Sequence, residues 1–147
     1  MTDTINKTEI DALNDVTKVL IDSRKGYEKC AELSVESFAF RTQFQKRASD
    51  RAALISRFQQ QVRTLGGEPQ TEGGTLGSLH RALTEFSSMF QDDRKAALEA
   101  IDDGEEHLAD SIKDRLEKSE VQGQSRALLE EAYSSARSGE AFADSLG

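Results

Sequence analysis

Apolar residues recur every three or four positions along four long stretches of this chain, with polar residues between them. That spacing places one apolar stripe along a helix and predicts helices that pack against one another. The stretches cover residues 7–36, 39–65, 93–117 and 120–145. A shorter pattern over residues 78–90 predicts one more, short helix. The expected fold class is therefore all-α.

Capping residues and glycines indicate where these helices begin and end. Asn6 with Glu9, and Ser119 with Gln122, have the spacing of a capping box, in which two side chains bond free backbone N–H groups at a helix start. The pair Gly66–Gly67 is expected to stop the second helix, because glycine adopts the left-handed conformation that ends helices.

The lengths of the connections predict the topology. A tight turn near Ser37 and a short link near residue 119 make each joined pair of helices antiparallel. The connection that starts at Gly66 is far longer and contains the short helix. A helix of about 25 residues is about 37 Å long, and such a connector can run back along it. The pattern therefore predicts a ferritin-like four-helix bundle with one long crossover that carries a short extra helix.

Composition and charge narrow the function classes. The chain has 147 residues, which suits one domain over residues 1–147. A net charge of −8 argues against nucleic-acid binding, which requires a basic surface, and disfavours anionic membranes. No apolar run approaches the roughly 20 residues of a membrane span. The N-terminus lacks the apolar segment of a secretory signal, and Cys30 has no partner, so a reducing cytoplasm is the expected location.

Charged residues interrupt the apolar stripes at several positions. We expect a buried polar network from four of them: Arg24, Glu32, Arg51 and Glu105. Buried charges must be paired, because an unpaired one costs several kcal/mol. For Arg51 and Glu105 the favoured interpretation is a buried or half-buried ion pair. For Arg24, Glu28 and Glu32 the favoured interpretation is a solvated helix edge with pairs one turn apart.

The same carboxylates raise the question of a metal site. Ferritin-like di-iron sites use one Glu from each of two helices and a Glu-x-x-His from each of the other two. The two histidines here, His80 and His107, each have glycine three positions before them, so no Glu-x-x-His occurs. No metal or other cofactor is therefore expected. The alternative is a reduced iron or manganese site built from Glu28, Glu32, Glu105 and His107.

Several short motifs in a fixed order resemble an uncharacterised bacterial family of ferritin-like four-helix-bundle proteins, a domain of unknown function. The motifs are YEKCAE from Tyr27, R-x-x-L-I-x-x-F from Arg51, L-G-G from Leu65, G-x-L-H-R from Gly77 and D-G-E-E from Asp103. The resemblance covers residues 9 to 143. It implies a cytoplasmic helical bundle without assigned chemistry, with matching polar positions at Glu32, Arg51, His80 and Glu105.

Two features depart from that family. The resemblance implies a polar inward face on the last helix, where this chain has Ala132, Ala136 and Gly139. It also implies an acidic residue at Arg57. Both departures count against metal binding in this chain.

The favoured function is a non-enzymatic, stress-related interaction or structural protein that forms a homo-oligomer. One surface predicted for an interface is the apolar side of the short helix: Leu79, Leu83, Phe86, Met89 and Phe90. The alternatives are a metal-binding or oxidase-type protein that uses the reduced carboxylate and histidine site, and a small-molecule carrier with a pocket beside Arg51 and Glu105.

Overall fold

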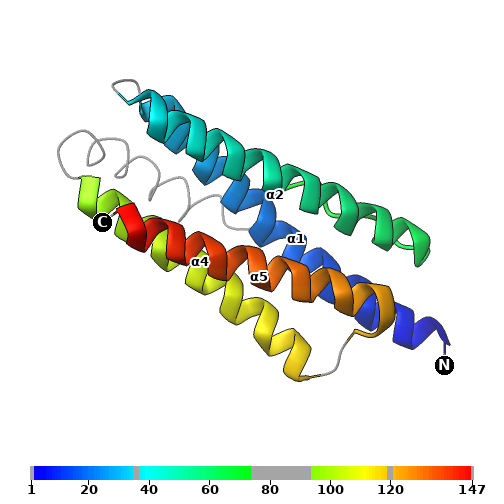
Figure 1. Cartoon of the computed structure of the whole chain (residues 1–147). Helices are drawn as coiled ribbons and strands as arrows, with labels where there is room; N and C mark the ends of the chain where they lie inside the picture. The colour runs from blue at the N-terminus through cyan, green and yellow to red at the C-terminus, as the bar shows by residue number, and fades with distance from the viewer. Residues whose placement is uncertain (1, 35–36, 74–93, 119–120, 147) are drawn as a thin grey trace.

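Four long helices make up the regular structure of the described chain. The computed structural model describes residues 2–34, 37–73, 94–118 and 121–146. The helices are α1 (Thr2–Leu33), α2 (Phe38–Thr64), α4 (Arg94–Glu117) and α5 (Gly123–Leu146), and no strand occurs in the described part of the chain (Figure 1). The all-α prediction is confirmed. The predicted short helix over residues 78–90, with His80 and the five interface residues Leu79, Leu83, Phe86, Met89 and Phe90, lies outside the described residues.

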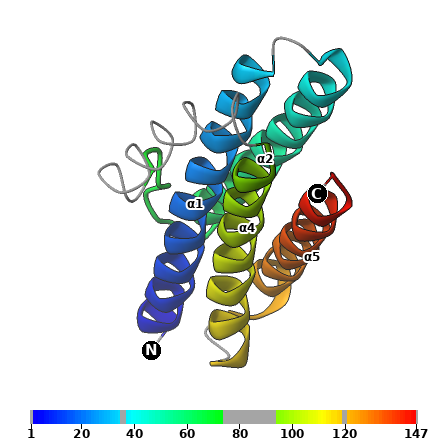
Figure 2. The ribbon, with the colours of Figure 1, turned by 90° about the vertical axis from the view of Figure 1, so that its left-hand side faces the viewer.

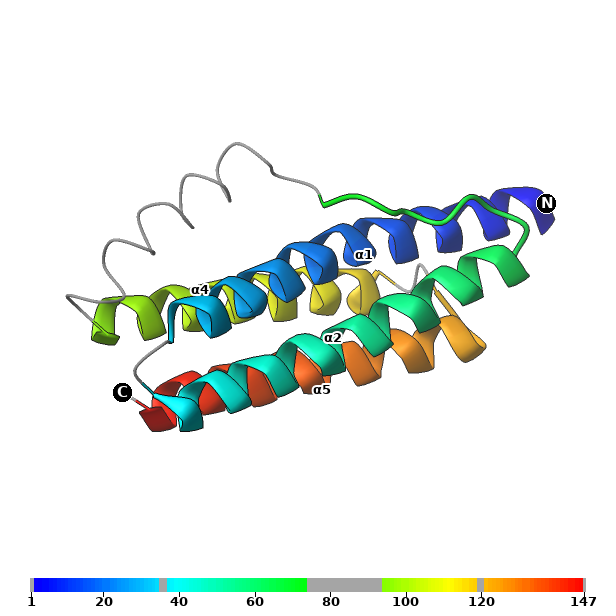
Figure 3. The ribbon, with the colours of Figure 1, turned by 90° about the horizontal axis from the view of Figure 1, so that it is seen from above.

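The helices form two antiparallel pairs, α1 with α2 and α4 with α5, that pack side by side (Figures 2 and 3). Side-chain contacts fix how the pairs meet. On α1 Asp15 contacts Arg115 of α4, and Ser23 contacts Glu105 of α4, so these two helices run in opposite directions. It follows that α2 and α4, which the long connection joins, run in the same direction.

Two serines lie at the helix ends that flank the connection between α1 and α2. α1 ends at Leu33, three residues before the expected end at 36, and Ser34 Oγ donates to the Cys30 carbonyl at 2.8 Å. Ser37 caps α2, because its Oγ accepts a hydrogen bond from the Phe40 N–H at 3.3 Å. Side-chain hydrogen bonds of Ser34 and Ser37 therefore reinforce the two helix ends on either side of the expected tight turn.

Gly66 ends α2 as the sequence predicts. Its φ of 88° lies in the left-handed region that favours glycine. The Gly66 N–H donates to the Arg63 carbonyl at 3.0 Å, and the Gly67 N–H donates to the Val62 carbonyl at 2.9 Å. These two bonds form a Schellman motif, which satisfies the last carbonyls of the helix. Gly67 lies against Ile10 of α1, so the chain leaves α2 pressed on its neighbour.

The next residues run along α1. The side chain of Asn14 holds this segment at two points, because Nδ2 donates to the Glu68 carbonyl and Oδ1 accepts from the Gln70 N–H, both at 2.9 Å. Further on, Gly73 lies against Asp22 of α1. The long connection therefore starts back along the bundle from the end of α2.

The expected capping box at Asn6 and Glu9 is replaced by a contact between helices. α1 begins at Thr2, so Asn6 lies inside it. The buried Glu9 carboxylate instead accepts bonds from the Gln122 N–H at 3.3 Å and from Ser125 Oγ at 3.2 Å. A carboxylate at this place satisfies one orphan N–H group and complements the helix dipole.

α5 begins at Gly123, three residues after the expected start at 120. Of the capping box predicted there, Ser119 lies outside the described residues. Glu9 therefore serves α5 as a cap from another helix.

A layer of buried polar side chains around Arg51 and Glu105, called the polar layer below, divides the core into two apolar clusters. Both clusters draw on α1 and α2. The larger includes Leu13, Leu20, Phe58, Leu108, Ile112 and Leu129. The smaller contains Tyr27, Cys30, Ala31, Phe44 and Ala48. Phe142 of α5 meets Phe44 edge-on, with ring centroids 5.8 Å apart.

None of the described helices is both long and apolar enough to cross a membrane.

Candidate functional site

The polar layer is built around Arg51 of α2 and Glu105 of α4. Their exposed fractions are 1% and 2%, so water does not solvate this charged pair. Arg51 Nη1 donates to Glu105 Oε1 at 2.8 Å, and Arg51 Nη2 donates to Glu105 Oε2. The pair is bidentate, which is the strongest geometry for a guanidinium and a carboxylate.

The other two helices complete the coordination of the guanidinium. From α1, Ser23 Oγ accepts a hydrogen bond from Arg51 Nη1 and lies 3.2 Å from Glu105 Oε1, to which it donates. From α5, Ser135 accepts twice: its Oγ from Arg51 Nε and its carbonyl from Arg51 Nη2, both at 3.2 Å. A guanidinium has five N–H donors, and these contacts with Glu105, Ser23 and Ser135 use all five. The buried charge is therefore fully compensated and hydrogen-bonded.

Gly139 makes room for the carboxylate. It lies on α5, and a Cβ atom built there would overlap the carboxylate of Glu105. The close approach of α5 to Glu105 therefore requires a residue without a side chain at position 139.

Tyr27 covers the layer on the side of the smaller cluster. The Arg51 guanidinium carbon lies 5.7 Å from the centroid of the Tyr27 ring, within the range of a cation–π contact. The Tyr27 hydroxyl is buried next to the Glu105 carboxylate. Burial and then the negative charge of Glu105 raise the pKa of Tyr27 far above its usual value. This hydroxyl therefore stays protonated.

The structure places the other predicted polar residues elsewhere. Arg24 pairs with Glu28 at 3.3 Å on the outer side of α1, where the two side chains are 34% and 55% exposed. Glu32 pairs with Lys29 at 3.5 Å and is 71% exposed. His107 is exposed on α4. Of the four residues predicted to form a buried network, the structure brings together Arg51 and Glu105, because only those two face the bundle axis.

The chemistry open to this layer is limited. Glu105 is the one carboxylate of the predicted metal set that points inward, and both of its oxygens already accept from Arg51. Within the described ranges no group of three His, Cys, Asp or Glu side chains could hold a metal ion. A metal at Glu105 would have to displace the guanidinium and would then meet serine hydroxyls, which are weak ligands for iron or manganese.

Sequence reasoning missed Ser23 and Ser135, and it placed Gly139 on the inward face of the last helix without predicting its contact with Glu105. Serine occurs on both buried and exposed helix faces, so its type alone carries little signal. Arg51 and Glu105 were detectable because each interrupts an apolar stripe. The roles of the other three depend on the registers of α1 and α5 against the pair, and spacing within one helix does not determine such registers.

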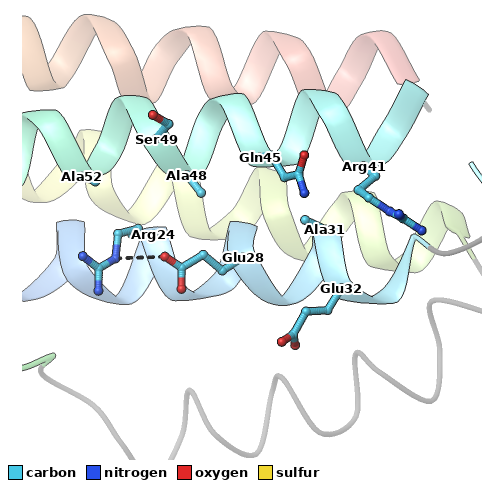
Figure 4. A pocket seen from close by; sticks show the side chains of 9 residues that line it. All are labelled: Arg24, Glu28, Ala31, Glu32, Arg41, Gln45, Ala48, Ser49 and Ala52. Atoms are coloured by element: carbon cyan, nitrogen blue, oxygen red, sulfur yellow. Dashed lines mark ion pairs between the residues drawn. The ribbon is translucent and has the colours of Figure 1, made fainter. Parts of the chain in front are cut away.

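A groove on the outer face of α1 and α2 is the second feature of interest. A cavity of about 660 Å³ lies there, with Ala31, Ala48 and Ala52 among its lining residues. Figure 4 shows Arg24 and Glu28 on the α1 side and Arg41, Gln45 and Ser49 on the α2 side. This cavity does not include Arg51 or Glu105, so it is separate from the polar layer.

Comparison with known proteins gives one match. No protein of curated function and no solved structure matches the chain. A family model, described as a domain of unknown function (DUF2383), matches residues 8–118. The match includes Arg51 and Glu105 and ends before α5, which supplies Ser135 and Gly139 to the polar layer. Because the match covers most of the chain, the protein belongs to the family with the domain of unknown function DUF2383.

Proposed function

We propose that this protein is a ferritin-like four-helix bundle that acts as a non-enzymatic structural or interaction protein. The Arg51 guanidinium holds the central position that a metal cation would need. The observation that carries the proposal is the complete use of its five donors by Glu105, Ser23 and Ser135. A buried site with every donor satisfied stabilises one arrangement of four helices and leaves no open position for substrate.

Charge balance supports this function over a metal-dependent one. A di-metal centre requires several carboxylates around the cations, whereas the layer contains one carboxylate and one cation. Glu28 and Glu32, the other carboxylates of the predicted metal set, are paired with Arg24 and Lys29 at the surface. We place the protein in a reducing cytoplasm, in keeping with Cys30, which is buried as a free thiol.

The test is the metal content of the purified full chain. It is measured by plasma mass spectrometry before and after loading with iron and with manganese, under aerobic and anaerobic conditions. We expect a value near zero that loading does not change. The matched variants are Glu105→Ala, which removes the inward carboxylate, and Glu28→Ala, which removes an exposed one. One or two metal ions per chain, lost in Glu105→Ala and kept in Glu28→Ala, would overturn the proposal.

A further inference from the structure

The segment that follows α2 crosses the groove between α1 and α2. Residues 67–73, called the strap below, leave the end of α2 and lie against α1 (Figure 3). Gln70 bridges the two helices, because its N–H donates to Asn14 Oδ1 on α1 and its carbonyl accepts from Gln59 Nε2 on α2, both at 2.9 Å. Asn14 Nδ2 also donates to the Glu68 carbonyl at 2.9 Å. The strap is therefore tied to both walls of the groove.

The cavity on the outer face of α1 and α2 lies further along the same groove. Glu28 follows Asn14 by 14 residues on α1, and Gln45 precedes Gln59 by 14 residues on α2. This spacing is close to four helical turns, so each pair lies on one face of its helix. Glu28 and Gln45 line the cavity of about 660 Å³, whereas Asn14 and Gln59 hold the strap. The strap therefore covers one part of a groove whose next part is the cavity.

The strap has no buried anchor. None of residues 67–73 is buried, and the segment GEPQTEG has no Leu, Ile, Val, Met or aromatic side chain that could enter the core. The bonds from Asn14 and Gln59 join neutral side-chain amides to backbone groups. Each such bond is weak in net terms, because water competes for the same groups. Segments with few buried contacts open locally, at a lower free energy than the whole fold.

The end of α2 gives the strap a fixed starting point. Gly66 has a φ of 88°, and the Gly67 N–H is bonded to the Val62 carbonyl as part of the helix end. These features lie within α2 and its cap, so they do not require the strap to be attached. The chain can therefore move after Gly67 while α2 keeps its last turn.

We propose that the strap opens as one unit, hinged at Gly67, and that its opening extends the cavity along the groove toward Asn14 and Gln59. In the closed state these two side chains hold the Gln70 backbone between them. In the open state the same amides line a longer groove and face solvent. The hydrogen bonds that hold the strap involve neither Arg51 nor Glu105, so its opening is independent of whether the polar layer binds metal.

The experiment is amide hydrogen exchange of the full chain, followed by NMR at several low urea concentrations. The Gln70 N–H should be protected, because it is bonded to Asn14, yet it should exchange about 100-fold faster than the buried Phe58 N–H of α2. The Gln70 rate should not depend on urea, since opening the strap exposes little surface. The Phe58 rate should rise with urea, because that amide exchanges through unfolding of the bundle.

Gln59→Ala supplies the sharpest comparison, because Gln59 bonds the Gln70 carbonyl and leaves its N–H untouched. If the strap opens as one unit, this variant should speed exchange of the Gln70 N–H by about fivefold to tenfold and leave the Gly67 N–H unchanged. Gln60→Ala, at the exposed neighbouring position, is the matched control and should change neither rate. A Gln70 N–H that exchanges only together with Phe58, that is unprotected in the parent protein, or that Gln59→Ala leaves unchanged would overturn the proposal.

Discussion

Removing one partner of the buried pair should cost far more than removing both. Arg51→Met leaves the Glu105 carboxylate buried without its counter-charge. Glu105→Leu likewise leaves the Arg51 guanidinium buried without its counter-charge. Each single variant should lower the free energy of unfolding by about 3–5 kcal/mol, and the double variant by clearly less than either. Urea denaturation of the four proteins measures the coupling in one cycle.

An exposed pair provides the control for that cycle. Arg57 and Glu131 join α2 to α5 at 2.6 Å, with both side chains about half exposed. The matching variants Arg57→Met and Glu131→Leu should change the free energy of unfolding by about 1 kcal/mol or less, because water screens the pair. Equal effects at the two pairs would mean that burial does not set the energetics of the polar layer.

Two helical glycines allow a test of the close approach to Glu105. Alanine normally stabilises a helix by about 1 kcal/mol relative to glycine. Gly104→Ala on α4 should show this gain, because nothing lies within 4 Å of the added Cβ. Gly139→Ala should destabilise the protein instead, since its Cβ would overlap the Glu105 carboxylate. The thermal unfolding midpoints of the two variants measure these changes in stability. A higher midpoint for both variants would contradict the described packing.

Gly139 also marks the limit of what the sequence predicts about the site. An arginine and a glutamate on apolar stripes are visible because each is the wrong residue type for its position. A glycine on the last helix appears only as a missing ligand. That it accommodates the carboxylate follows from the distance between α4 and α5, which depends on the packing of the whole bundle.

At the scale of elements, the start of α5 depends on a side chain from α1. Glu9→Ala removes the carboxylate that accepts from the Gln122 N–H and from Ser125 Oγ. We expect a loss of about 1 kcal/mol, the usual effect of removing a helix cap, together with faster amide exchange in the first turn of α5. Asp11→Ala, an exposed neighbour on α1, is the control. Exchange in the first turn of α5 that stays as slow as in the parent protein would count against Glu9 as its cap.

Glu9 also shows what the spacing of residues within one helix cannot predict. Glu9 has capping-box spacing from Asn6, so the pattern correctly marks it as a capping residue and assigns it to the wrong helix. Local spacing cannot distinguish a cap within one helix from a cap given to a neighbour. The glycine stop of α2 was predictable because Gly66 acts through its own backbone.

Where α4 and α5 run close together, acidic residues repel one another. Burial and then the charges of Asp144 and Asp103 raise the pKa of Asp102. A raised folded-state pKa means that ionised Asp102 destabilises the fold above that pKa, and that the penalty disappears once it is protonated. Asp102→Asn should therefore raise the urea midpoint slightly at neutral pH and lose this advantage toward about pH 4, near the ordinary range of aspartate. A difference in urea midpoint between Asp102→Asn and the parent protein that grows on acidification would contradict this prediction.

At the scale of the whole molecule, connection lengths allowed the sequence to predict which helices run in the same direction. Short links force antiparallel pairs, and a long connector can return along a helix, as residues 66–73 do beside α1. Position along the chain does not, however, determine which side chains meet in the centre. That outcome requires the packing of all four helices at once, and the polar layer is where their registers are joined.

The family match ends at residue 118, and this raises the question whether the matched part folds without α5. We expect that it does not. A chain of residues 1–118 would lose Ser135, which accepts from two donors of Arg51, and would expose core that Leu129, Ala132 and Ala136 cover. Such a fragment should unfold without a cooperative transition in urea, whereas the full chain should show one. Addition of a peptide of residues 119–147 should restore cooperativity, because the register of α5 is specified by contacts with Arg51, Glu105 and Glu9. A fragment that unfolds cooperatively by itself would mean that the polar layer needs only three helices, and that α5 is an accessory to the bundle.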